Sequence, residues 1–383
     1  MNIVYVGIPK AGGGYSHFCQ LKNKLTQYNF TLLSLGENKV SFDYEEEAFV
    51  NIGQGLNLTH HQKELAHLFI DYLIKNKVNI LIPNNSPLVV SCLPFLPSNI
   101  NVVYIVNSDT PRVYQYVATH SDYISRIVCI SPVQVKKLGN RYPRLSSKLI
   151  LIPHGLDVQD INPISIREKK TLQIGFLGRL HDGHKKVLII PKILKRFGGS
   201  YNLHIVGDGP DKTDLLRLLD KHNISYTYHG FIKNKDLAPI ISLWDIMLFP
   251  SVVEGFGLTL IETMQYGVVP IANRLEGITD YIIENGESGY LVSNNDVSSY
   301  LDKLNKLNND SDLMLKMKRK AKSRVIERFD ISKVCSDYEM VFREAMLYHR
   351  PPTDKIADWQ PYKEYKPNII QRVINSMKLY FGN

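Results

Sequence analysis

Short apolar segments alternate with longer amphipathic segments along most of the chain. In the first half the apolar segments lie at 2–8, 30–36, 79–83, 101–106, 126–131 and 148–153. Segments that stay apolar are typical of strands buried on both faces of a parallel sheet. Between them, residues 16–28 and 61–76 place apolar side chains three and four positions apart, which predicts helices. This alternation predicts repeated strand-helix-strand units.

The alternation is interrupted once and then starts again. Residues 156–170 are polar, contain Pro163 and end in a basic run, so we expect an interdomain linker there. Further apolar segments follow at 171–178, 201–207, 224–230, 246–251, 268–273 and 289–292. Two successive arrays predict two α/β, doubly wound domains, which bind ligands at the carboxyl ends of their strands. We expect domains at 1–160 and 161–328, with a C-terminal helix and tail at 329–383 that return to the first domain.

Composition limits the class of protein. A chain of 383 residues is longer than one hydrophobic core usually serves, and no apolar run approaches the about 18 residues of a membrane span. The first residues lead directly into a predicted strand, so we expect no secretory signal. The four cysteines are scattered without a C-x-x-C pair, which predicts neither a disulfide framework nor a zinc site. These features favour the cytoplasm.

The charge is compatible with several partners. A net charge of +9 suits nucleic acid, anionic lipid, a phosphorylated ligand or simply a basic surface. We interpret the basic run at 316–324 as a solvated helix face. The amphipathic segment 368–383 is expected to pack on the neighbouring domain, with a membrane surface as the alternative.

Glycines follow the first predicted strand. Gly12, Gly13 and Gly14 precede a helix expected near Ser16, and such a turn either lets backbone amides approach a ligand or is a purely structural turn. The sequence is not G-x-G-x-x-G, and no acidic residue ends the next strand. Both departures argue against a nicotinamide-dependent oxidoreductase.

Basic residues follow a strand of the second array. Arg179 comes just after the segment 171–178, and Lys185 and Lys186 lie near a predicted helix start. A guanidinium and an ammonium at a strand's carboxyl end suit the oxygens of a diphosphate. Gly207 and Asp208 occupy another strand-to-loop turn, where Asp208 either contacts a ligand or stabilises the turn.

Two carboxylates flank a third turn, in the sequence PSVVEGFGLTLIE. Glu254 lies in a predicted loop, and Glu262 lies more than one turn into the helix that follows. Acids near a helix start often only complement its dipole, and paired carboxylates also act as acid and base in hydrolases. Their strand-loop-helix placement, together with Arg179 and Lys185, instead favours a nucleotide-diphosphate ligand held between the two glutamates. The backbone amides of the intervening residues would face phosphate; these residues are Gly255, Phe256, Gly257, Leu258 and Thr259.

Several segments, in order, resemble the retaining glycosyltransferases of family 4. They are IPHGLD, GFLGRL, LHIVGDGP, YHGFI, PSVVEGFGLTLIETMQYGVVPIAN, GITDYIIENGESGYLV and FDISKVCSDYEMVFREAM, and they cover most of residues 125–346. The N-terminal half is similar chiefly in layout. The resemblance implies the GT-B fold, in which two Rossmann-like domains face each other across a cleft.

The resemblance also implies roles for particular residues. Glu262 would bind the ribose and Glu254 the donor sugar, while Arg179 and Lys185 would neutralise the leaving diphosphate without a metal. Lys186 competes with Lys185, because the spacing from Arg179 is one residue longer than is common in the family. The glycines at 12–14 would lie near the diphosphate and the acceptor.

One position departs from the family. Many relatives carry a histidine near the donor sugar where this chain has Asn107 and Ser108. Asn107 is therefore a possible sugar contact, with His120 and His154 as alternatives. The resemblance implies no catalytic base, since the leaving phosphate is thought to assist a front-face displacement.

The function implied is transfer of a sugar from a nucleotide-diphosphate sugar, UDP favoured over GDP, to an unidentified acceptor. The acceptor would belong to polysaccharide, glycolipid or protein glycan assembly, bound by the N-terminal domain, with the donor bound by the C-terminal domain. We expect placement in the cytoplasm, with the inner face of the membrane as the alternative, and no nucleic acid partner. A GT-B epimerase or phosphorylase is the first alternative, and a non-catalytic protein that binds an anionic ligand is the second.

Overall fold

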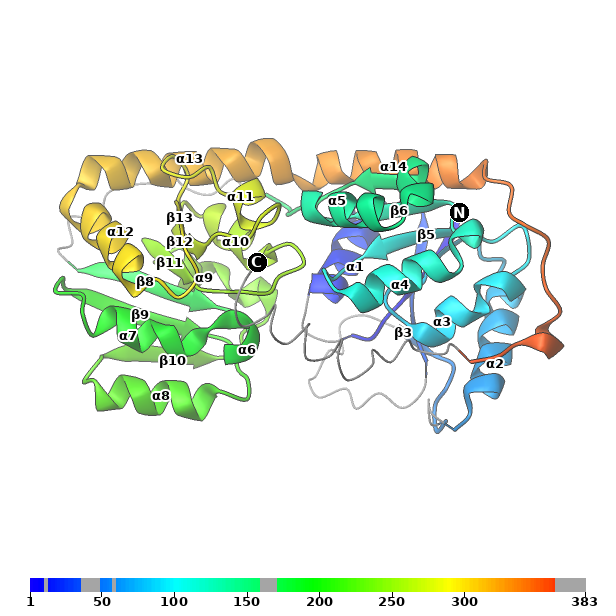
Figure 1. Cartoon of the computed structure of the whole chain (residues 1–383), viewed down its shortest axis with the longest axis horizontal. Helices are drawn as coiled ribbons and strands as arrows, with labels where there is room; N and C mark the ends of the chain where they lie inside the picture. The colour runs from blue at the N-terminus through cyan, green and yellow to red at the C-terminus, as the bar shows by residue number, and fades with distance from the viewer. Residues whose placement is uncertain (10–12, 36–48, 57–59, 159–170, 362–383) are drawn as a thin grey trace.

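The computed structural model describes residues 1–9, 13–35, 49–56, 60–158 and 171–361. Two separate parallel sheets lie side by side along the long axis of the molecule (Figure 1). The strands of the first sheet are β1 (Asn2–Val6), β2 (Asn29–Ser34), β3 (Phe49–Asn51), β4 (Ile80–Ile82), β5 (Asn101–Val106), β6 (Arg126–Cys129) and β7 (Leu149–Leu151). Those of the second are β8 (Leu172–Leu177), β9 (Tyr201–Val206), β10 (Tyr226–Gly230), β11 (Ile246–Phe249), β12 (Val269–Asn273) and β13 (Tyr290–Val292).

The strand orders are those of doubly wound domains. The seven strands of the first sheet run in the order β3-β2-β1-β4-β5-β6-β7, and the six of the second in the order β10-β9-β8-β11-β12-β13. In each sheet the order reverses beside its first strand, β1 or β8, which places a ligand crevice at the carboxyl ends there. The central strands β5, β8 and β12 are buried along their whole length, as their apolar sequences predicted. The prediction of two Rossmann-like domains is confirmed.

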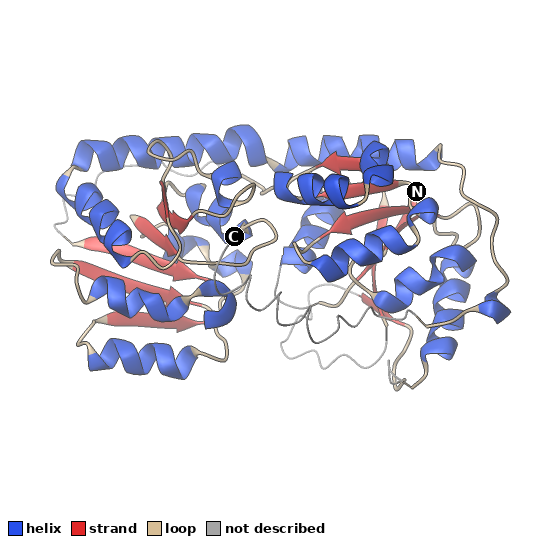
Figure 2. Cartoon of the chain, in the orientation of Figure 1, coloured by secondary structure: helices blue, strands red, loops and turns tan. Residues whose placement is uncertain are grey.

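Helices cover both faces of each sheet (Figure 2). Those of the first domain are α1 (Gly13–Lys24), α2 (Gln62–Lys75), α3 (Pro87–Cys92), α4 (Pro111–Thr119) and α5 (Pro132–Arg141), with the 3-10 turns η1 (Leu93–Phe95), η2 (Ser121–Tyr123) and η3 (Pro143–Lys148). Those around the second sheet are α6 (Asp182–Lys185), η4 (Val187–Ile189), α7 (Ile190–Leu194), α8 (Lys212–Lys221), η5 (Asn234–Asp236), α9 (Ala238–Ile241), α10 (Leu258–Met264), α11 (Thr279–Ile282), α12 (Val297–Asn309) and α13 (Ser311–Phe329). The chain then forms α14 (Ile331–Met346) and η6 (Ile356–Asp358).

Strand β3 is an element that the sequence analysis missed. It has only three residues and pairs with β2 at the edge of the first sheet. All three residues are partly exposed. Because so short an edge strand buries little apolar surface, its hydrophobic pattern is too weak to predict it.

Aspartates set the starts of the last three long helices. Asp296, Asp310 and Asp330 each accept a hydrogen bond from a backbone amide in the first turn of α12, α13 and α14, respectively. Such N-caps satisfy amides that have no partner within the helix. Asp330 also separates α13 from α14, so that one long helical path covers the second domain and then the first (Figure 1).

The chain crosses between the domains at two places, and the crossings lie together. The Leu156 amide donates to the Phe329 carbonyl at 2.8 Å, and the Ile331 amide donates to the Leu156 carbonyl at 2.8 Å. Beside this bridge, a Cβ on Gly155 would lie 3.0 Å from the Ile331 Cα, so the close approach requires a small residue. After the second crossing, α14 packs on α1, β4 and β5 of the first domain.

The segment after α14 stays on the first domain. The Arg350 guanidinium donates to the backbone carbonyls of Leu93, Pro97 and Ile100. Trp359 is 3% exposed, and its indole nitrogen donates to the Ser91 hydroxyl at 3.2 Å. Residues 362–383, including the predicted amphipathic tail, lie outside the described residues.

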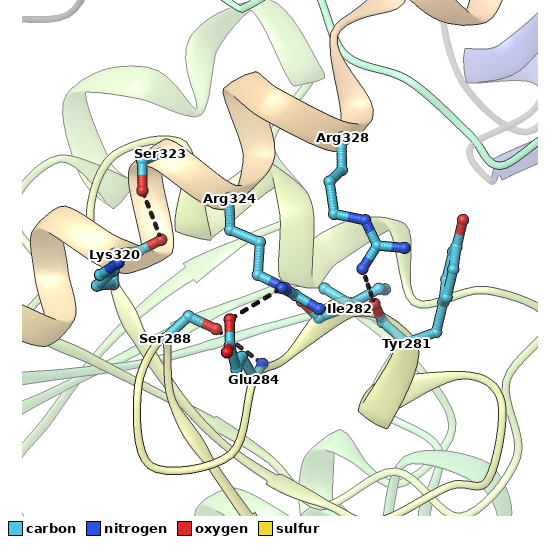
Figure 3. Close-up of polar contacts among 8 residues, drawn as sticks. All are labelled: Tyr281, Ile282, Glu284, Ser288, Lys320, Ser323, Arg324 and Arg328. Carbon is cyan, nitrogen blue, oxygen red and sulfur yellow. Dashed lines mark hydrogen bonds and ion pairs between the residues drawn. The ribbon is translucent and has the colours of Figure 1, made fainter.

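The basic run on α13 is partly internal (Figure 3). Arg324 donates to the carbonyls of Tyr281 and Ile282 at the end of α11 and pairs with Glu284 at 3.2 Å. Lys318 pairs with Asp245, and both side chains are largely buried. The interpretation of this run as a wholly solvated face is therefore wrong for Lys318 and Arg324, which attach α13 to the second sheet.

Gly175 provides a test of the packing in the second domain. A Cβ there would lie 2.1 Å from the Trp244 ring, which covers this position of β8. We expect Gly175→Ala to lower the free energy of unfolding by at least about 2 kcal/mol, because the indole cannot shift without disturbing a packed core. Gly198→Ala is the matched control, since nothing lies within 4 Å of its Cβ position. Urea denaturation of both variants measures the difference; equal stability would contradict this packing.

Candidate active site

The carboxyl ends of β8 and β9 approach each other very closely. A Cβ on Gly207 would lie 1.9 Å from the Gly178 carbonyl oxygen. Both glycines adopt positive φ angles, 130° for Gly207 and 150° for Gly178. A side chain at position 207 would push the two loops apart. Gly207 is therefore required to form the floor of the candidate site, whether or not it contacts a ligand.

Lys185 and Glu254 meet above this floor. The Lys185 Nζ lies 2.5 Å from the Glu254 Oε1, and the two side chains are only 18% and 11% exposed. Backbone contacts fix their spacing, because the Val252 amide donates to the His184 carbonyl at 2.8 Å. The two residues are 69 positions apart in the sequence, so the fold creates this pair.

Lys186 points elsewhere. It has a left-handed backbone with φ 46° at the end of α6, and its ammonium lies 3.6 Å from the Asp182 carboxylate. Asp182 in turn accepts from the Leu188 amide at 3.0 Å. Of the two competing lysines, Lys185 is therefore the one that the structure brings to Glu254.

Arg179 lies on the same rim and is exposed. Its guanidinium forms no hydrogen bond or ion pair with any residue of the described ranges. The pKa of His184 is lowered, first by burial and then by neighbouring charges that include Lys185 and Arg179. Arg179 and Lys185 therefore place two positive charges around α6.

Glu262 lies in the second turn of α10, behind the Lys185–Glu254 pair. Part of the residue reaches solvent, but protein atoms surround the carboxyl group. Burial raises the pKa of this carboxyl to about 7, and the charge of Lys185 opposes the shift. The two carboxyl groups thus differ: Glu254 is paired with Lys185, whereas Glu262 is partly protonated at neutral pH.

The loop between these acids has mixed roles. Phe256 is 3% exposed and its ring packs edge-on against His154 and Phe329, so a ligand can meet only its backbone. Gly257 precedes α10 with φ 99°. The Thr259 hydroxyl is buried and has no hydrogen-bond partner among the described residues.

Asp208 stabilises its own turn. Its Oδ1 accepts from the Gly209 amide at 2.7 Å, and its side chain lies 3.8 Å from the Lys212 ammonium. This geometry favours the turn role over ligand contact.

The first domain faces this site through Asn107. A Cβ on Gly255 would lie 3.0 Å from the Asn107 carbonyl oxygen, so the end of β5 touches the Glu254 loop. Gly13 and Gly14 form the start of α1, and a Cβ on Gly14 would lie 3.8 Å from the Asn84 amide nitrogen. Gly12 lies outside the described residues.

The two alternative histidines do not fit the site. His120 follows the end of α4, and thus lies toward the amino ends of the strands, beside Tyr123. His154 is 4% exposed, and its ring lies between those of His17 and Phe256. Burial lowers the pKa of His154 to about 4, so it is neutral at physiological pH and belongs to the packing between domains.

Asn84 and Tyr5 were not predicted from the sequence. Both lie at the carboxyl ends of strands in the first domain, and both accept a hydrogen bond from the Asn107 side-chain amide. Asn84 could have been noticed, because it follows the apolar segment 79–83 as Asn107 follows 101–106. Tyr5 could not have been noticed, because its position fits that of any other apolar residue in a predicted strand.

The described ranges hold neither a metal cluster nor a membrane-spanning helix. No group of three or more His, Cys, Asp or Glu side chains there could hold a metal ion. No helix in that part of the chain is both long and apolar enough to cross a membrane. The four cysteines, all within these ranges, form no disulfide.

Comparison with known families identifies this arrangement. The family described as Glycosyl transferases group 1 matches residues 157–324, a range that contains Arg179, Lys185, Glu254 and Glu262. Residues 157–324 of the chain thus match the group 1 glycosyltransferases. The predicted class of enzyme, a glycosyltransferase, is confirmed, while the family 4 assignment stays a prediction.

Relatives of this glycosyltransferase differ in how much they match. N-acetyl-alpha-D-glucosaminyl L-malate synthase of Bacillus anthracis is 33% identical over 144 residues, which is 38% of each chain. An uncharacterized glycosyltransferase of Haemophilus influenzae is 22% identical over 350 residues, covering 87% of this chain and 97% of its own. The chain thus spans about two fifths of the first relative and nearly all of the second.

Solved structures support the fold of the glycosyltransferase. The Anabaena protein Alr3699/HepE, in complex with UDP and glucose, superposes with a TM-score of 0.74. The alignment covers 90% of this chain and 99% of that chain at 13% identity. At this identity the likeness shows the fold alone, and it confirms the GT-B architecture.

The Glu262 carboxyl of the glycosyltransferase is expected to titrate near pH 7. Carbon-13 NMR of the side-chain carboxyl, assigned with Glu262→Gln, measures the midpoint. Lys185→Met should move the midpoint upward, because the ammonium favours the ionised form. Glu276, whose pKa is lowered by Lys136, is the internal control and should titrate below the usual range. A Glu262 midpoint near that of Glu276 would contradict the burial of this carboxyl.

Proposed function

We propose that the chain is a retaining glycosyltransferase that moves a sugar from a nucleotide-diphosphate sugar, a UDP-sugar in preference to a GDP-sugar, to an acceptor bound by the first domain. The observation that carries the proposal is the Lys185–Glu254 pair with Arg179 and Glu262 around it. Two basic groups, one carboxylate paired with a lysine and one carboxyl whose pKa is raised to about 7 follow the carboxyl ends of β8 and β11. This crevice is where doubly wound domains bind ligands.

The two cations would hold the diphosphate. Lys185 already has a carboxylate partner, so a phosphate oxygen would take over its charge and leave Glu254 free to accept from a sugar hydroxyl. Arg179, exposed and without a partner among the described residues, would add a second cation. Breaking the sugar–phosphate bond increases the charge on the leaving diphosphate, so both cations stabilise the transition state more than the ground state. In this proposal they do so without a metal.

Glu262 would bind the ribose. An ionised carboxylate accepts two hydrogen bonds and so suits a pair of ribose hydroxyls. Its pKa near 7 means that the empty protein must release a proton from Glu262 to reach this form. The complex of HepE with UDP and glucose supports a UDP-sugar as the donor.

The acceptor would enter from the first domain, where Gly13, Gly14 and Asn107 face the donor loop. Relatives include an alpha-monoglucosyldiacylglycerol synthase and a capsular polysaccharide glycosyltransferase. Their names support a lipid or glycan acceptor.

A donor screen tests the proposal. The protein is incubated with UDP-glucose, UDP-galactose, UDP-N-acetylglucosamine and GDP-mannose, and mass spectrometry detects slow hydrolysis of each. We expect hydrolysis of at least one, and a loss of about 100-fold or more in the Arg179→Ala, Lys185→Ala double variant. Lys186→Ala is the matched control and should retain activity, because Lys186 pairs with Asp182. Unchanged activity in the double variant would contradict the role of Arg179 and Lys185 in binding the diphosphate. An epimerised nucleotide sugar as product would support the epimerase alternative.

UDP affinity should depend on Glu262 and on pH. Calorimetry is expected to show that Glu262→Ala weakens UDP binding by about 10-fold or more, since two hydrogen bonds to a charged group are lost. In the wild type, affinity should rise as the pH increases through about 7, because the carboxyl must ionise to accept from the ribose. The pH dependence of UDP affinity is compared with that of Glu262→Gln, because the titration of UDP itself affects both proteins equally. If the two pH profiles have the same shape, Glu262 does not bind the ribose.

A further inference from the structure

Asn107 is held by two residues that the proposed donor site does not use. Its Nδ2 donates to the Asn84 Oδ1 at 3.0 Å and to the Tyr5 hydroxyl oxygen at 3.3 Å. The three side chains come from the carboxyl ends of β1, β4 and β5, which are adjacent in the first sheet. We call them the asparagine cluster.

The bonds of Asn84 fix which way the Asn107 amide faces. The Asn84 Nδ2 donates to the Val6 carbonyl at 3.2 Å, and its Oδ1 also accepts from the Asn85 amide at 2.9 Å. Because a carbonyl can only accept and an amide N–H can only donate, Asn84 must turn its oxygen toward Asn107. Asn107 must then present its nitrogen to Asn84.

This orientation leaves the Asn107 Oδ1 without a donor. The atom is buried and has no hydrogen-bond partner among the described residues. A buried acceptor without a donor costs about 1–3 kcal/mol, so the site gains when a ligand supplies one. Turning the amide over would not help, because it would set two oxygens against each other at Asn84.

The asparagine cluster also lies where the two domains meet. The backbone of Asn107 touches Gly255 in the Glu254 loop, and Asn84 and Tyr5 lie 3.8 and 3.9 Å from the Cβ position of Gly14. The cluster therefore connects the glycine turn before α1 with the loop that carries Glu254. Burial raises the pKa of Tyr5 to about 12, so its hydroxyl stays protonated and neutral.

The backbone of Asn84 is unusual as well. Its φ of 51° lies in the left-handed region, which asparagine adopts more readily than most residues. At this position asparagine tolerates the backbone conformation and supplies both the oxygen that faces Asn107 and the amide that donates to Val6.

We propose that Asn84 is a positioning residue for the transferred sugar: it fixes the Asn107 side chain so that Oδ1 accepts a hydrogen bond from a sugar hydroxyl of the donor. This inference rests on the proposed function. Asn84 acts through Asn107 and does not touch the sugar itself. The chain thus presents an acceptor of fixed direction, which selects a donor sugar with a hydroxyl at that position.

A double-variant cycle tests this. Asn84→Gly keeps the left-handed backbone and removes the oxygen, while Asn107→Ala removes the proposed sugar contact. With the nucleotide sugar that the wild type hydrolyses fastest, we expect each single variant to lose about 10-fold in kcat/KM, equivalent to one hydrogen bond. The double variant should lose no more than Asn107→Ala alone, because Asn84 acts only through Asn107. UDP affinity should be unchanged in all three variants.

Asn223→Gly separates positioning from a general effect of glycine on stability. It replaces an exposed asparagine whose φ is 53°, and it should match the wild type. Additive losses in the double variant, or full activity in Asn84→Gly, would each overturn the inference. If the wild type turns over no sugar, the proposed function fails with it; if the wild type is active and the cycle fails, only the role of Asn84 is lost.

Discussion

The short backbone bridge between Leu156 and the α13–α14 junction is the constraint on which the arrangement of the two domains depends. Its two hydrogen bonds tie the first interdomain crossing to the second, so both connections share one place. The rings of His17, His154, Phe256 and Phe329, the last of which belongs to the bridge, form a continuous series of edge-to-face contacts. Phe256 belongs to the loop that carries Glu254, which means that the core at the crossing also sets the position of the candidate site.

The electrostatics of the site follow from burial. Glu254 keeps a close ammonium partner, whereas Glu262, deeper behind it, is shifted toward the protonated form. A dianionic ligand would reverse this balance by taking the charge of Lys185 from Glu254. The empty site is therefore held together by an ion pair that the proposed reaction has to separate. Because the ligand would replace Glu254 as the partner of Lys185, separating the pair costs less than leaving either charge buried without a partner.

Much of the fold could be predicted because its strands are buried on both faces. The apolar segments at 101–106 and 171–178 correspond to β5 and β8, and the polar interruption before residue 171 separates the two sheets. β3 was not predicted, because a three-residue edge strand buries too little apolar surface to show a hydrophobic pattern. For the site, Arg179, Lys185 and Glu254 were predicted from short motifs, but the choice between Lys185 and Lys186 needed coordinates. A shift of one position along the chain changes the side of α6 on which a lysine lies. The spacing from Arg179 does not show whether Lys185 or Lys186 lies on the side of Glu254.

The unpartnered polar atoms show how the site depends on what it binds. Ser131 follows β6, Ser251 follows β11 and Thr259 begins the helix after the Glu254 loop, and each has a buried hydroxyl without a partner among the described residues. Together with the Asn107 Oδ1, they come from both domains and follow the carboxyl ends of strands. Each of these buried groups costs free energy that no contact among the described residues recovers. In the proposed function, a ligand rich in hydroxyl and phosphate groups would supply donors and acceptors to groups of both domains, so its binding would favour the arrangement in which the two domains meet.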